Sequence, residues 1–343
     1  MISKNESIRL KGIAILMMLF LHLFNTNERI ALCAPLVYVT DGKPLVQLLT
    51  RVASLCVPIY VFISGYGLSY IYEKADGKNI RIANRILRIY ANYWVIILLF
   101  VPIGSIVNPE LYPGNLITFL LNFSGISYSY NHEWWFLMPY IILVLCSSHI
   151  ISAAHKLDKR KAINWGIGMI IFYIMLRLLR GVVPVFPGKD FIFNLLNLLF
   201  PFFAGIIFAH HRILGRFRNF ITNRWKDRSN YYLCALLFLV CSLRIAIKTS
   251  TFDALYALLL ITLLTCINLP EWSKHTLEKV GKQSTNMWLI HTFYSWYFFS
   301  DFFYGLRYPL VMFPALVVVS YGTSALIHKI YDPLNRRILS LPF

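Results

Sequence analysis

Two histidines lie inside long apolar stretches of this 343-residue sequence, where an ionisable side chain is costly. His22 belongs to the segment 8–25, and His291 follows the run MWLI. Imidazole titrates near neutral pH, so a histidine in such a place can act as a general base toward a hydroxyl group. Each can also be a core histidine that is hydrogen-bonded to a backbone carbonyl. For His291, which has no carboxylate at helical spacing, this structural interpretation is favoured.

A carboxylate and two tryptophans mark the expected outer end of another apolar segment. Glu133 follows His132 and precedes Trp134 and Trp135. The carboxylate could orient an acceptor sugar or assist proton transfer, and the indole rings offer a stacking surface. A carboxylate at a helix start and tryptophans at a membrane interface explain the same residues without a function. The sequence leaves both interpretations open.

Three arginines share one face of a predicted helix at a membrane boundary. Arg81, Arg85 and Arg88 are spaced i, i+4 and i+7. Guanidinium groups can pair bidentately with phosphate oxygens, so this face suits a polyphosphate. The alternative is ordinary basic residues that contact lipid headgroups.

Two other features have a functional and a structural interpretation. Ser64 and Gly65 interrupt the bulky run PIYVFISGYGL, which indicates either a close helix contact or a residue that lines a site. Arg177 and Arg180 lie near the expected outer end of a segment, where they could bind an anionic acceptor. Snorkelling of their side chains to the interface is favoured.

The composition is that of a membrane protein: 58% of the residues are hydrophobic, 14% are charged and the mean hydropathy is +0.60. A bilayer core needs about 20 apolar residues per helix. We therefore predict an all-α polytopic membrane protein of about ten transmembrane helices. The ten segments cover residues 8–26, 46–72, 90–107, 134–152, 163–180, 191–209, 231–248, 252–269, 285–303 and 308–328.

The basic residues predict the topology. With the N-terminus in the cytoplasm, most Lys and Arg fall on the inner side, which places both termini inside. The formal net charge of +18 is thus mainly a topology signal, and nucleic-acid binding is excluded as its explanation. The first segment lacks a small-residue cleavage site, so we interpret it as an uncleaved helix of a multi-pass cell-membrane protein. The six cysteines show no C-x-x-C pair and no metal spacing, so we expect no metal.

Several blocks, in order, resemble the membrane-bound acyltransferase family 3, integral membrane O-acyltransferases that include modifiers of bacterial surface polysaccharides. The blocks are IRLKGIAILMMLFLHLF with His22, VFISGYGL with Ser64, RILRIY with Arg85 and Arg88, WWFL from Trp134, and GKQSTNMWLIH ending at His291.

The resemblance implies an acyl-CoA donor on the cytoplasmic side and an acceptor hydroxyl at the other face. It implies that His22 is the essential histidine of the first helix and that Arg85 and Arg88 are the paired arginines. Ala91 and Asn92 depart from the family, since many relatives have proline after the arginine block. No appended extracytoplasmic hydrolase-like domain follows, so we expect a stand-alone member with one domain over residues 1–343.

The expected function is O-acetyl transfer from cytoplasmic acetyl-CoA to a hydroxyl of a cell-surface polysaccharide or its lipid-linked precursor. The expected partners are acyl-CoA, the surface glycan or lipid-linked saccharide, and membrane lipid. One alternative is a transporter or flippase of a glycan or small metabolite; another is a sensor or assembly factor without chemistry. We predict His22 as the catalytic residue. The predicted substrate- or donor-binding residues are Arg81, Arg85, Arg88, Ser64, Glu133, Trp135 and His291.

Overall fold

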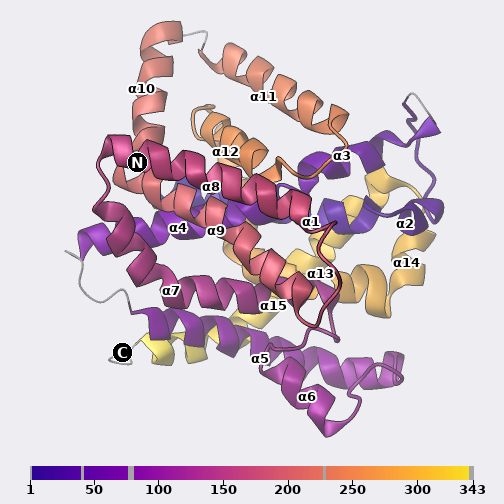
Figure 1. The fold of residues 1–343 in the computed structure, drawn as a ribbon. Helices are drawn as coiled ribbons and strands as arrows, with labels where there is room; N and C mark the ends of the chain where they lie inside the picture. The colour runs from indigo at the N-terminus through magenta and orange to yellow at the C-terminus, as the bar shows by residue number, and fades with distance from the viewer. Residues whose placement is uncertain (1, 40–41, 76–80, 227–228, 340–343) are drawn as a thin grey trace. The chain divides into compact units, whose positions relative to one another are not determined.

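The computed structural model describes residues 2–39, 42–75, 81–226 and 229–339 (Figure 1). Throughout these ranges the regular structure is helical, apart from one isolated bridge between Tyr38 and Pro44. The all-α fold class is therefore confirmed.

Most of the helices coincide with the apolar segments. In chain order they are α1 (Lys4–Phe24), α2 (Asn27–Ala31), α3 (Leu45–Ala53), α4 (Cys56–Lys74), α5 (Ile82–Val107), α6 (Leu116–Phe123), the 3₁₀ helix η2 (His132–Phe136), α7 (Leu137–His155), α8 (Lys159–Leu179), α9 (Lys189–His210), α10 (Ile213–Trp225), α11 (Ser229–Ala246), α12 (Asp253–Leu264), α13 (Glu271–Thr292), the π-helix η4 (Phe293–Phe298), α14 (Ser300–Gly305) and α15 (Pro309–Leu339).

Within the described residues, eight helical segments are long and apolar enough to cross a membrane, so the chain is polytopic. Two of the ten predicted segments differ. The segment 252–269 contains α12, whose 12 residues extend only about 18 Å. The segment 285–303 is divided among the end of α13, η4 and α14. The location of both termini in the cytoplasm stays a prediction.

The chain divides into two compact units. Unit 1 comprises Met1–Ala14, Ser54–Ile80 and Ile142–Gly281, and unit 2 comprises Ile15–Ala53, Arg81–Ile141 and Lys282–Phe343. Helices α1, α7 and α13 each contribute residues to both units. The single domain over residues 1–343 stays a prediction.

In unit 1, α4 packs closely against α9. A Cβ atom at Gly65 would collide with the carbonyl oxygen of Phe202, and one at Gly205 would collide with the carbonyl oxygen of Phe62. Small residues let two helix backbones approach in this way. The close helix contact, one of the two interpretations of the Ser64–Gly65 pair, is thus present at Gly65.

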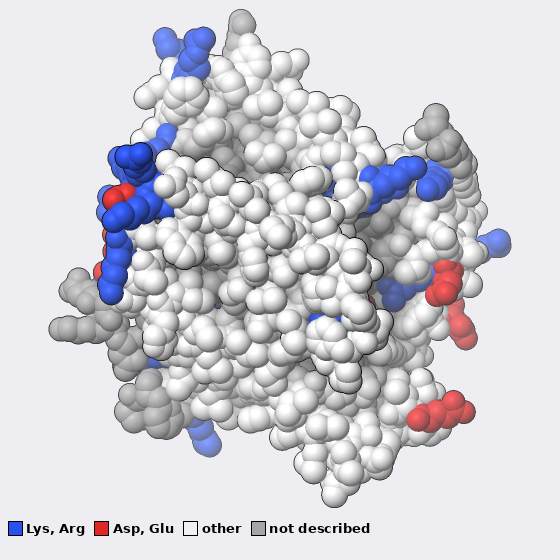
Figure 2. Space-filling model, viewed as in Figure 1, with Lys and Arg blue, Asp and Glu red and all other residues white. Residues whose placement is uncertain are grey.

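Helix α8 of unit 1 has a largely apolar surface. Figure 2 shows Lys and Arg atoms near the start of this helix and white atoms along its middle. Its exposed side chains include Ile163, Trp165, Ile167 and Leu178. Such a surface is stable against lipid and costly in water, which agrees with a membrane-spanning helix.

In unit 2, α5 and α15 pack side by side (Figure 1). Aromatic rings surround Phe293 of η4. Phe100 of α5 stacks on Phe293 with 4.7 Å between ring centroids. Trp134 lies 5.6 Å from Phe293 and 4.8 Å from Tyr93, both edge to face. These contacts anchor η2, the short helix that carries Glu133.

Candidate active site

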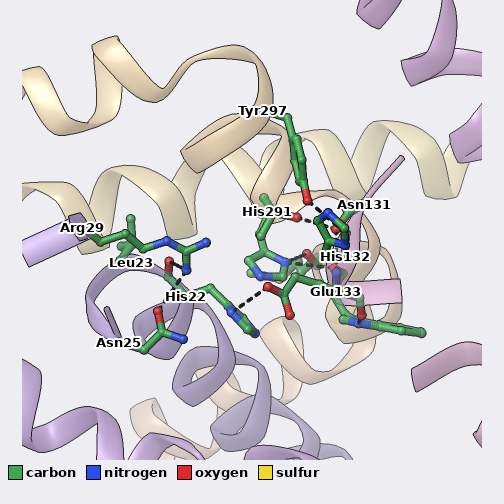
Figure 3. Close-up of polar contacts among 12 residues, drawn as sticks. His22, Leu23, Asn25, Arg29, Asn131, His132, Glu133, His291 and Tyr297 are labelled. Atoms are coloured by element: carbon green, nitrogen blue, oxygen red, sulfur yellow. Dashed lines mark hydrogen bonds and ion pairs between the residues drawn. The ribbon is translucent and has the colours of Figure 1, made fainter. Parts of the chain in front are cut away.

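His22 and Glu133, from distant parts of the chain, meet in unit 2. His22 lies in the last turn of α1, and its Nδ1 is 3.1 Å from Oε1 of Glu133 (Figure 3). Their side chains are 12% and 17% exposed. The two groups come from α1 and η2, and both lie in unit 2. The pair can therefore accept and release a proton in a site shielded from bulk water.

Hydrogen bonds hold Glu133 on both sides of its backbone. Its N–H donates to Oδ1 of Asn131 at 3.0 Å, and its carbonyl accepts from Nε1 of Trp288 at 3.0 Å. The hydroxyl of Thr292 donates to the same Asn131 oxygen at 2.9 Å. Because Trp288 and Thr292 lie near the end of α13, that helix holds η2, and with it the backbone of Glu133, in place.

His291 lies beside His22, with 5.2 Å between the ring centroids (Figure 3). Its Nδ1 is 3.1 Å from the carbonyl oxygen of Met287 and 2.8 Å from that of Trp288. A carbonyl only accepts, so Nδ1 carries a proton. The expected structural hydrogen bond is thus present, and it places a fully buried imidazole next to the pair.

Arg29 is a member of this site that the sequence analysis missed. It lies on α2, is 9% exposed, and donates from Nη1 to the carbonyl oxygen of His22 and to Oδ1 of Asn25. Its guanidinium lies 4.7 Å from the centre of the Trp296 ring. The available signal was an arginine just beyond the expected outer end of the first span, against the positive-inside rule. We call His22, Glu133, His291 and Arg29 the His22 cluster.

The arginines at the start of α5 do not all share a helical face. The helix begins at Ile82, and Arg81 is its N-cap residue with a left-handed backbone, φ 44°. Only Arg85 and Arg88 therefore lie within the helix, three residues apart on one face. Arg85 donates to the hydroxyl of Tyr140 at 3.1 Å. The exposed Arg88 has its backbone carbonyl bonded to the hydroxyl of Tyr331 at 2.8 Å.

Helix α5 carries the arginines near its start and, further along, a residue that packs beside the His22 cluster. It continues without a break from Ile82 to Val107, and its Tyr93 packs on Trp134, the neighbour of Glu133. Arg85 precedes Tyr93 by eight residues, which is about 12 Å along the helix axis. A ligand bound at the arginines would therefore need an extended arm to reach the level of Glu133.

Two predicted site residues are not among these contacts. Trp135 lies on η2, half-buried, with its ring 5.9 Å from that of Phe136. Ser64 is buried on α4 in unit 1. The role of each stays a prediction.

The thiol nearest to Arg29 is a poor nucleophile. Cys33 donates through Sγ to the backbone carbonyl of Arg29 at 3.2 Å. Burial raises the pKa of this thiol to about 11, so it stays protonated at neutral pH. An acyl group held covalently on Cys33 is therefore disfavoured.

Comparison with protein families identifies the class. The model of the acyltransferase domain family Acyl_transf_3 matches residues 6–329, nearly the whole chain. The chain belongs to this family, which makes it a polytopic membrane acyltransferase. No curated protein and no solved structure matches it.

Proposed function

We propose that the protein is an O-acetyltransferase that moves an acetyl group from cytoplasmic acetyl-CoA to a hydroxyl of a cell-surface polysaccharide or its lipid-linked precursor. The observation that carries the proposal is the contact of 3.1 Å between Nδ1 of His22 and Oε1 of Glu133 inside unit 2. An imidazole oriented by a carboxylate is the arrangement that acyl transfer to a weak nucleophile requires.

In the proposed mechanism the two nitrogens of His22 have different roles. With its proton on Nδ1, the nitrogen that lies 3.1 Å from Glu133, the imidazole keeps the lone pair of Nε2 for the acceptor. Nε2 removes the hydroxyl proton while the oxygen attacks the thioester carbonyl carbon. When the tetrahedral intermediate collapses, the C–S bond breaks and the imidazolium returns this proton to the leaving sulfur. The products are the acetyl ester and the free thiol of CoA, and Glu133 stabilises the imidazolium throughout.

Arg85 and Arg88 supply the donor end of the proposed site. Two guanidinium groups near the start of α5 suit the phosphates of CoA. The separation of about 12 Å along α5 between Arg85 and the level of Tyr93 agrees with a donor whose phosphates and reacting carbonyl are joined by a long arm. The donor then places its acetyl group at His22 while its phosphates stay near the arginines.

A covalent acetyl-histidine is the rival mechanism within this function. In that scheme Nε2 of His22 attacks the thioester itself and the acceptor hydroxyl attacks second. Incubation with radiolabelled acetyl-CoA in the absence of acceptor separates the two. Label on the protein that is lost in His22→Ala favours the covalent route, and no label favours direct transfer.

The test of the function is transfer of label. Purified protein in lipid nanodiscs is incubated with radiolabelled acetyl-CoA and with glycans extracted from the surface of the source cell. We expect label in the glycan, released by mild base as an ester would be. Movement of glycan across a vesicle membrane without any acetylation would support the transporter alternative. Mass spectrometry of the glycan from cells with and without the protein identifies the acetylated sugar.

A further inference from the structure

Asn92 lies on the same face of α5 as the two arginines. At 100° per residue, Arg85, Arg88 and Asn92 fall within an arc of about 60°. Asn92 is four residues beyond Arg88, about 6 Å deeper along the axis, and directly precedes Tyr93. A ligand that extends from the arginines to the level of Glu133 would therefore pass this position.

A chain of hydrogen bonds in unit 2 fixes the orientation of the Asn92 amide. Nδ2 of Asn286 donates to the backbone carbonyl of Ser324 at 3.3 Å, and a carbonyl can only accept. Oδ1 of Asn286 must then face Asn92, which donates to it through Nδ2. The Oδ1 atom of Asn92 is left on the other side of the amide.

That oxygen is buried without a donor. Asn92 is 5% exposed, and within the described parts of the chain its Oδ1 has no hydrogen-bond partner. A buried acceptor without a partner is destabilising, so a ligand that brings a donor to this point would be stabilised by it. The complementary group must carry an N–H or O–H.

We propose that Oδ1 of Asn92 accepts a hydrogen bond from a secondary amide N–H of the pantetheine arm of the acyl-CoA. This inference rests on the proposed function, because it assigns a third contact to the same donor. The arm carries two secondary amides between its phosphate end and its thioester. Asn92 lies between the arginines that suit the phosphates and the level of the residues that suit the thioester, so its oxygen selects for an amide-containing arm.

The test is a cycle in which the protein and the ligand are each changed. The ligands are CoA and two analogues in which one or the other amide N–H is replaced by an ester oxygen. Binding to wild type and to Asn92→Ala is measured by titration calorimetry in nanodiscs. We expect one analogue to bind wild type about tenfold more weakly than CoA, and Asn92→Ala to bind CoA about tenfold more weakly. That analogue and CoA should bind Asn92→Ala equally, because the contact is already lost.

Two variants control for the interhelical bond that Asn92→Ala also removes. Asn286→Ala removes the partner of Nδ2 and keeps the Asn92 oxygen, and Asn92→Asp keeps an acceptor oxygen in a side chain of the same size. Both should retain the preference for CoA over the analogue. The inference is wrong if the analogue binds Asn92→Ala about a hundredfold more weakly than CoA binds wild type, because the two losses of affinity would then be independent. It is also wrong if neither analogue binds wild type more weakly than CoA. Wild type that binds CoA but shows no such preference contradicts the inference alone, whereas wild type that does not bind CoA contradicts the proposed function as well.

Discussion

A second group of buried charges, in unit 1, provides a comparison for the His22 cluster. We call Arg244, Asp253 and Ser54 the Arg244 cluster. Nη2 of Arg244 is 2.8 Å from Oδ1 of Asp253, and the Ser54 hydroxyl donates to Oδ2 at 3.0 Å. The Arg244 and Asp253 side chains are 3% and 10% exposed. The contacts join α11, α12 and the turn before α4. We therefore interpret the cluster as a structural contact that holds these elements together.

The two clusters differ in whether the basic side chain can release a proton. A guanidinium does not release its proton in a protein, so Arg244 keeps its positive charge. In the His22 cluster the group opposite the carboxylate is an imidazole, a kind of side chain that can both accept and donate a proton. Burial and an ion pair are common to both clusters. Only the titratable partner, beside a second imidazole and an arginine, makes one of them suitable for proton transfer.

Replacing His22 by alanine should have the largest effect on activity. Loss of the general base is expected to lower kcat by about 10²- to 10⁴-fold among the molecules that stay folded. Label transfer from acetyl-CoA measures the activity, and membrane abundance with the apparent Tm controls for folding. Appreciable turnover in well-folded His22→Ala would contradict the catalytic role.

Replacing Asp253 by asparagine should lower stability and leave kcat unchanged, the opposite of the effect expected for His22→Ala. It leaves the buried Arg244 without an opposite charge, which we expect to cost about 3–5 kcal/mol of stability. Thermal unfolding in nanodiscs should show a lower Tm, while the molecules that stay folded retain their kcat. A matched control is the double variant Arg244→Met/Asp253→Leu, which removes both charges and should recover most of the Tm. A fall in kcat without a fall in Tm would contradict the structural role of the Arg244 cluster.

Replacing Glu133 by glutamine tests the orientation of His22. The amide keeps the shape of the side chain and removes the charge that favours a proton on Nδ1, so we expect kcat to fall roughly 10²-fold. Binding of CoA should be unchanged, because Glu133 does not contact the phosphates in the proposed mechanism. Activity within a factor of two of wild type would leave Glu133 as a structural residue of η2.

Replacing Arg85 and Arg88 together by alanine should have the smallest effect on kcat. Phosphate pairing holds the donor in the ground state and in the transition state, so we expect mainly a higher KM for acetyl-CoA, by about tenfold or more. Lysine at both positions restores the charge without the bidentate fork, and should recover only part of the affinity. An unchanged KM in the double alanine variant at normal membrane abundance would leave the arginines as topology signals.

The features found from the sequence are those that a short window of residues determines. Long apolar runs predicted an all-α membrane protein, and a lone imidazole within such a run singled out His22. The spacing of Arg85 and Arg88 on one helix was also visible, whereas the place of Arg81 was not. The sequence pattern does not show that α5 begins at Ile82 and leaves Arg81 with a left-handed backbone.

The partners of these residues depend on the tertiary structure. His22 meets Glu133 because the end of α13 holds η2 in place through Trp288 and Thr292, and no local pattern encodes that packing. Arg29 resembled a loop charge until its contacts with Asn25 and the His22 carbonyl were visible. Hydropathy and helical period depend on neighbours in the chain, and the sequence alone determines them. Which nitrogen of an imidazole faces a carboxylate depends on side chains from distant helices, and only the folded chain decides it.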